Sequence, residues 1–119
     1  MTKLGKRQLK NNTEVVLYTA AHYHDISSES VSGTVSWDMT AKPSRILSLT
    51  GSITLSNPTN MDAIQTGVII IKQTSGGDTV SWDTAFVGMN GDAIPDVDTT
   101  ASAVTILFYV CDGTNMYIR

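Results

Sequence analysis

The sequence lacks several features that would place it in a well-defined class. A single cysteine, Cys111, permits neither an internal disulfide nor a cysteine-based zinc site. It lies in the apolar run AVTILFYVCDG, where a buried and unreactive thiol is expected. No run of about 18 apolar residues is present, so no membrane-spanning helix is expected. The basic N-terminus has no apolar stretch behind it, so no secretory signal is expected either.

Helical periodicity is also nearly absent. No 11-residue window has apolar residues spaced i, i+3, i+4, i+7 without an interrupting Gly or Pro. Ser, Thr and β-branched residues instead form short runs bounded by turn residues, which is typical of strands. Strands are predicted at 14–20, 33–39, 45–51, 52–56, 67–73, 78–83, 103–113 and 115–119.

Turn residues separate these strands. Gly76-Gly77 and Asp112-Gly113 each predict a tight hairpin, because glycine adopts the positive φ angles that such turns need. Pro58 lies in the turn cluster SNPTN, and residues 84–102 predict a long surface loop. We therefore expect one all-β domain over residues 14–119, an antiparallel β-sandwich or jelly-roll-like fold of about eight short strands. An extended basic arm, residues 1–13, precedes it.

Alternation of apolar and polar residues predicts which side chains form the core. Residues of one phase are expected to point inward on each strand, since successive side chains of a strand point to opposite faces. The predicted core comprises Val35, Trp37, Leu47, Leu49, Ile53, Leu55, Ile69, Ile71, Val80, Trp82, Ile106 and Phe108.

The pentapeptide TVSWD occurs twice, at 34–38 and 79–83. A spacing of this size could indicate a propeller repeat. However, the flanking sequences share no pattern, and a chain of 119 residues is too short for the four or more blades of a propeller. We interpret each copy as a strand end that buries Val and Trp and then turns on Asp38 or Asp83.

The net charge of −3 is distributed unevenly. Residues 1–12 contain four bases and no acid, a charge of +4, whereas the remainder has all 11 acids against the other four bases, a charge of −7. A basic arm can bind nucleic acid, but this one has no aromatic residue and the acidic body would repel phosphate. We expect a protein partner instead, with no nucleic acid and no membrane. The predicted partner-binding residues are Lys3, Leu4, Lys6, Arg7, Leu9 and Lys10.

Two groups of residues could bind metal, although a simpler explanation is favoured for each. His22 and His24 would share one face of a strand, a known ligand spacing, but no Cys or third His completes the shell, so polar alternation on a strand face is the favoured explanation. A metal at an oligomer axis remains an alternative for them. Asp92, Asp96 and Asp98 lack the ligand spacing of a calcium loop and are expected to be solvated loop acids.

No sequence signal for catalysis is evident. No Ser lies in a Gly-x-Ser-x-Gly turn, and the glycine-rich stretch TSGGDTV leads into a strand and not into a phosphate-binding helix. We therefore expect no enzyme activity, no cofactor and no small-molecule substrate.

Residues 33–119 resemble a small β-domain of tailed-bacteriophage virion proteins. The likeness is carried by LTGSITL at 49–55, by NPTN at 57–60, by QTSGGDTVSW at 73–82 and by DGTNMY at 112–117. Each motif is common in turns and strands, but their order and spacing are similar to those of this family.

The resemblance implies a structural module, often trimeric, without catalytic residues. The length of the chain and its basic arm favour a capsid decoration protein, located on the capsid surface as a homotrimer that binds the major capsid protein. The alternative is a tail or tail-fibre module that binds carbohydrate or another tail protein. Its sugar contacts would come from Tyr23, Trp37, Trp82 and the loop 84–102, because exposed aromatic rings stack on sugars. Inward-pointing tryptophans would argue against this alternative.

Overall fold

The structure is a computed structural model that describes residues 26–119. These residues form strands β1 (Ser28–Val35), β2 (Arg45–Leu55), β3 (Ala63–Gln73), β4 (Val80–Trp82), β5 (Phe86–Gly88), β6 (Val104–Asp112) and β7 (Met116–Ile118). A short 3-10 turn, η1 (Met89–Gly91), is the only helical element in this range. The prediction of an all-β protein is confirmed. The basic arm, the predicted strand 14–20 and His22, Tyr23 and His24 lie outside the described residues.

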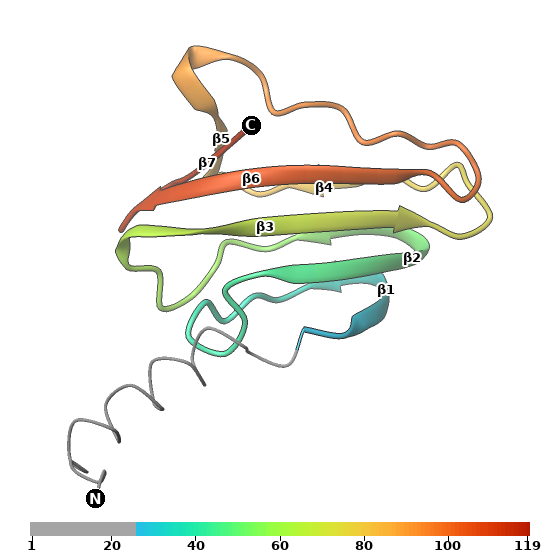
Figure 1. Cartoon of the computed structure of the whole chain (residues 1–119), viewed down its shortest axis with the longest axis horizontal. Helices are drawn as coiled ribbons and strands as arrows, with labels where there is room; N and C mark the ends of the chain where they lie inside the picture. Colours follow the sequence, from blue (N-terminus) through green and yellow to red (C-terminus); the bar gives the residue numbers. More distant parts are fainter. Residues whose placement is uncertain (1–25) are drawn as a thin grey trace, which may run out of the picture.

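The strands form one seven-stranded sheet in the order β1-β2-β3-β6-β7-β5, and β4 pairs with β2 beside this path (Figure 1). The expectation of an antiparallel sheet is wrong in part, because the sheet is mixed. β1, β2 and β3 run parallel, as do β2 with β4 and β5 with β7, whereas β6 is antiparallel to both β3 and β7. The loops 36–44 and 56–62 each return the chain to the edge of the sheet where the preceding strand began. The next strand therefore runs parallel to it.

Strand β2 connects the two parts of the sheet. The sequence predicted two strands, 45–51 and 52–56, but they form one continuous strand. Its first half, Arg45–Leu49, pairs with β3, and its second half, Ile53–Leu55, pairs with β4. Gly76-Gly77 does form a turn with φ angles of +91° and +83°, but the predicted hairpin is wrong because β3 and β4 pair with β2 and not with each other.

The second predicted hairpin is confirmed. β6 and β7 are antiparallel neighbours joined by Asp112-Gly113. The Asp112 carboxylate accepts hydrogen bonds from the backbone N–H groups of Asn115 (2.7 Å) and Thr114 (2.9 Å). These bonds, together with one from Tyr117, lower the pKa of Asp112.

Most of the predicted core is buried. Val35, Trp37, Leu47, Leu49, Ile53, Leu55, Ile69 and Ile71 belong to one cluster that also contains Met39, Phe86, Leu107, Tyr109, Cys111, Met116 and Ile118. Val80 and Trp82 are only partly buried and pack against the margin of this cluster. Cys111 is buried as expected, and burial raises the pKa of its thiol to about 11.

The core prediction is wrong for strand β6. Ile106 and Phe108 are 54% and 55% exposed, whereas Leu107, Tyr109 and Cys111 of the opposite phase are buried. The run VTILFYVC is apolar in both phases, so alternation could not indicate which phase points inward. Tyr109 decides the phase, because its ring packs edge-on against Trp37 at 5.7 Å and its hydroxyl donates a hydrogen bond to the carbonyl oxygen of Pro43.

An ion pair between Arg45 and Glu29 joins β2 to β1 near the N-terminal ends of these parallel strands. The buried Arg45 guanidinium donates hydrogen bonds to both Glu29 carboxylate oxygens, at 3.0 and 2.6 Å, and to the carbonyl oxygen of Ser36 at 2.7 Å. It also lies 5.6 Å from the centre of the Trp37 ring, in cation–π geometry. One side chain thus joins β1, β2 and the loop between them.

The two TVSWD copies are not equivalent. Leu55 of β2 pairs with Val35 of the first copy and with Trp82 of the second, so the copies are displaced by two residues. Both aspartates accept hydrogen bonds in the turns that follow, Asp38 from the N–H of Thr40 and Asp83 from that of Thr84. The interpretation as two strand ends, and not a repeat, agrees with this register.

Candidate functional site

Strand β6 exposes a row of large apolar side chains. Val104, Ile106, Phe108 and Val110 are 53%, 54%, 55% and 38% exposed. They occupy alternate positions of one strand and therefore point to the same face of the sheet. An apolar row of this kind is unusual on the surface of a folded chain.

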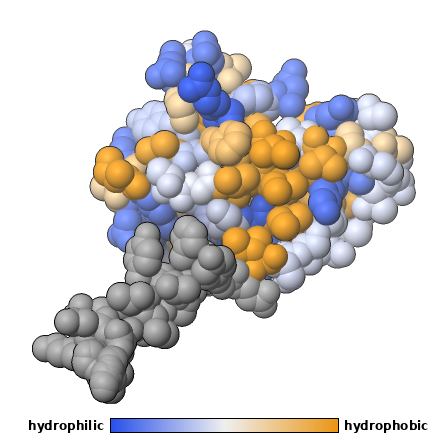
Figure 2. Space-filling view, viewed as in Figure 1, coloured by the Kyte–Doolittle hydropathy of each residue, from blue (hydrophilic) through white to orange (hydrophobic). Residues whose placement is uncertain are grey.

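The row continues across the sheet onto β3 and β2. Val68 pairs with Phe108, and Ile70 pairs with Ile106 on one side and with Ile46 on the other. Figure 2 shows the resulting continuous hydrophobic area on this side of the molecule. We call it the apolar sheet face; it comprises Ile46, Val68, Ile70, Val104, Ile106, Phe108 and Val110.

Polar residues border the apolar sheet face. Lys72 is paired with Val104 and with Ser48, Thr66 is paired with Val110, and Asp112 follows two residues after Val110 on β6. None of the seven residues of the face carries a charge. An uncharged, apolar centre with a polar rim is the composition of a protein–protein interface.

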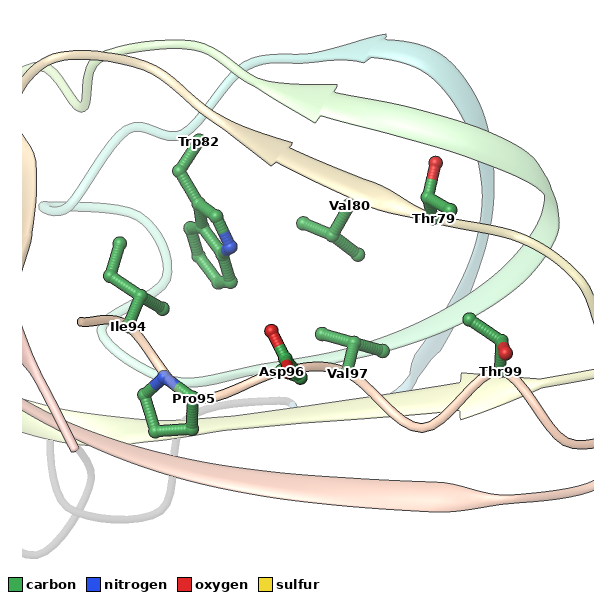
Figure 3. Close-up of a pocket in the computed structure, with 8 residues that line it drawn as sticks. All are labelled: Thr79, Val80, Trp82, Ile94, Pro95, Asp96, Val97 and Thr99. Atoms are coloured by element: carbon green, nitrogen blue, oxygen red, sulfur yellow. The ribbon is translucent and has the colours of Figure 1, made fainter.

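A second candidate site is a groove of about 440 Å³ between β4 and the loop that follows η1. Figure 3 shows that Val80 and Trp82 project from β4 on one side of this groove, while residues 94–99 form the other side. We call it the Trp82 groove; it is lined by Thr79, Val80, Trp82, Ile94, Pro95, Asp96, Val97 and Thr99.

The Trp82 groove combines an aromatic ring with polar atoms. Trp82 packs against Phe86 with their ring centres 5.2 Å apart. Its indole N–H has no hydrogen-bond acceptor among residues 26–119, and neither the Asp96 carboxylate nor the Thr99 hydroxyl has a partner there. Figure 3 shows the Asp96 side chain between the indole and Val97, within the groove.

The far end of the loop is anchored. The N–H of Gly77 donates to the carbonyl oxygen of Thr99 at 2.7 Å, and the N–H of Asp98 donates to the Thr105 hydroxyl at 3.0 Å. The Asp98 carboxylate accepts from the N–H of Thr100, and this bond lowers its pKa. Asp98 is therefore engaged in a turn, which leaves Asp96 as the acid that lines the groove.

The residues predicted as alternative sites are separated by the fold. Trp37 is 2% exposed, and its indole N–H donates to the carbonyl oxygen of Lys42, so it does not line the groove with Trp82. Asp92 lines a different, smaller cavity beside Asn90 and Arg119. Within residues 26–119, no three His, Cys, Asp or Glu side chains are grouped closely enough to hold a metal ion.

The sequence indicated the groove in part, through Trp82 and the loop 84–102, but it missed the apolar sheet face. The signal for the face was present in β6, where both sets of alternate positions are apolar. A strand with only one buried face needs apolar residues at only one set. Over the described range, no helix has the length and apolar character needed to cross a membrane.

Comparison with family models, with curated proteins and with solved structures finds no match to this chain. The geometry of the two candidate sites is therefore the basis for assigning a function.

Proposed function

We propose that this chain is a non-enzymatic structural protein of a bacteriophage virion, a capsid decoration protein that assembles as a homotrimer. Its oligomer and its basic N-terminal arm bind the major capsid protein on the capsid surface. The apolar sheet face is the observation that carries this proposal, because a face of this composition requires a macromolecular partner. The resemblance of residues 33–119 to virion β-domains supports it.

A second copy of the chain is the occupant of the apolar sheet face. The described residues contain nine acids and four bases, so two copies repel one another over most of their surface. The apolar sheet face is uncharged and is the region where that repulsion is weakest. Burial there is favourable at about 25 cal/mol per Å² of apolar surface.

The shape of the face also suits association between identical copies. Apolar side chains on three neighbouring strands form a pleated surface, and such surfaces pack face to face about 10 Å apart. Three copies around a threefold axis would bury their apolar sheet faces against one another at the trimer centre. We also propose that each subunit is a β-sandwich or jelly-roll-like domain.

Sedimentation equilibrium of the full chain tests the self-association. We expect the wild type to sediment as a trimer and Ile106→Lys to sediment as a monomer, because a charge at the centre of the face would be desolvated on association. The matched control is Thr54→Lys, which adds the same charge to an exposed position of β2 that pairs with β4 and β1. A monomeric wild type would overturn the proposed interface.

Capsid binding requires a separate test. Purified protein is mixed with undecorated capsids and, in parallel, with isolated tails, and each mixture is sedimented. We expect the wild type to co-sediment with capsids and a variant that lacks residues 1–12 to remain in the supernatant. Binding to tails alone would contradict a decoration role and favour the alternative, a tail module.

A further inference from the structure

We propose that the Trp82 groove is a binding site for a neutral sugar ring, such as a hexopyranose of a surface polysaccharide. This inference is independent of the apolar sheet face and goes beyond the structural role proposed above. It depends on three properties of the groove: its aromatic wall, its unpartnered polar atoms and its charge.

The aromatic wall suits the apolar face of a pyranose. A sugar ring presents C–H groups on one face and hydroxyls around its edge, so it binds well where an aromatic ring lies beside polar groups. Trp82 supplies the ring, and its contact with Phe86 holds the indole in place before a ligand arrives. Val80, Ile94 and Val97 pack on the core and complete an apolar floor.

The polar atoms of the groove suit the hydroxyls of the ring edge. The indole N–H is a donor, the Asp96 carboxylate is an acceptor, and the Thr99 hydroxyl can act as either. A charged acceptor forms stronger hydrogen bonds than a neutral one, so Asp96 is expected to contribute most to affinity and orientation. The Thr79 hydroxyl is already close to the Ser52 hydroxyl, at 3.3 Å, and has a lesser part.

The charge of the groove selects the class of sugar. Asp96 is the only ionisable residue that lines it, and Asp92 and Asp98 lie on the same loop. A carboxylated sugar would be repelled, since no cation in the lining pairs with it. The volume of about 440 Å³ falls within the range of small-molecule sites, about 300–1,000 Å³.

Saturation-transfer NMR and tryptophan fluorescence test the site. The probes are glucose, galactose, N-acetylglucosamine and N-acetylneuraminic acid, each titrated against the full chain. We expect saturation transfer to the ring protons of at least one neutral sugar and none to N-acetylneuraminic acid. The fluorescence change should come from Trp82, because Trp37 is buried in the core.

Two variants locate the binding. Asp96→Asn should weaken the affinity about tenfold, or 1.4 kcal/mol. Asp92→Asn is the matched control, since it removes the same charge from the same loop outside the groove and should leave affinity unchanged. Trp82→Ala should abolish the saturation transfer, and Trp82→Phe should restore part of it, which separates lost stacking from lost folding.

Several results would overturn the inference: no transfer to any neutral sugar, equal binding of the acidic sugar, or wild-type affinity in Asp96→Asn. Because Asp96 is exposed and lines the Trp82 groove, and is not part of the apolar sheet face, sedimentation of Asp96→Asn should remain that of the wild type. Failure of the sugar site can therefore be distinguished from failure of the proposed assembly.

Discussion

Single side chains hold neighbouring elements together where the parallel strands begin, and Arg45 is the clearest case. The Arg45 side chain is 7% exposed, so its guanidinium needs hydrogen-bond partners within the protein, and Glu29 and the carbonyl oxygen of Ser36 supply three of them. Lys42 lies 3.6 Å from the same carboxylate and adds a weaker attraction. These contacts make Glu29 a structural carboxylate, although it lies on an edge strand.

Glu29→Gln should lower the free energy of unfolding by about 1–3 kcal/mol, the usual cost of leaving a buried polar group unsatisfied. The hydrogen bond from Arg45 holds the pKa of Glu29 below its ordinary value of 4.5. The stability from this pair is thus complete above pH 4.5 and is lost as the pH falls through the lower, folded-state pKa.

Urea unfolding of wild type and Glu29→Gln between pH 7 and pH 3 measures this effect. We expect the difference between the two proteins to shrink as the solution becomes acidic. A difference that stayed constant over this range would show that the charge of Glu29 contributes nothing.

Gly67 permits a close approach at the centre of β3. A methyl group there would overlap the carbonyl oxygen of Pro43 and the Tyr109 ring. Gly67→Ala should therefore destabilise the fold by about 1–3 kcal/mol, as overpacking of a core does. Thermal unfolding measures the effect, with Thr66→Ala on the exposed side of the same strand as the control. An unchanged melting temperature would show that the Pro43 loop can move aside.

At the scale of elements, β6 is the strand whose two faces differ in role but not in composition. Its inner face, with Leu107, Tyr109 and Cys111, belongs to the core. Its outer face, with Ile106 and Phe108, belongs to the apolar sheet face. Substitutions at adjacent positions should consequently have different effects.

Leu107→Asn should cost about 3–5 kcal/mol, since it removes buried apolar volume and places an amide in the core. Ile106→Asn should change the unfolding free energy of the monomer by less than about 1 kcal/mol. Denaturant unfolding at low protein concentration measures both. Equal effects would mean that the two faces of β6 are buried to a similar extent.

At the scale of the whole molecule, the apolar sheet face links folding to association. If copies associate through it, the unfolding midpoint must rise with protein concentration, because association stabilises only the folded chain. We expect a rise of a few degrees for the wild type over a hundredfold range of concentration and none for Ile106→Lys. Differential scanning calorimetry makes this measurement. A midpoint independent of concentration in both proteins would argue for a monomer.

Much of the fold could be predicted from local patterns. Alternation in residues 47–55 identified Leu47, Leu49, Ile53 and Leu55 as buried, and Asp112-Gly113 identified a hairpin. These predictions succeeded because strand period and turn geometry depend on neighbouring residues alone. The candidate sugar groove was only half predicted, since Trp82 and the loop 84–102 are sugar contacts only of the alternative function, whereas the favoured interpretation assigns Trp82 to the core.

The sequence by itself determined the all-β class and the inward face of β2, because each follows from composition or from a period of two. Only the tertiary structure decided that β1, β2 and β3 run parallel, that Trp37 and Trp82 have different environments and that β6 turns Ile106 and Phe108 outward. Those outcomes depend on where the chain returns after each loop and on what Tyr109 packs against. Contacts of that kind join residues distant in sequence, and no local pattern records them.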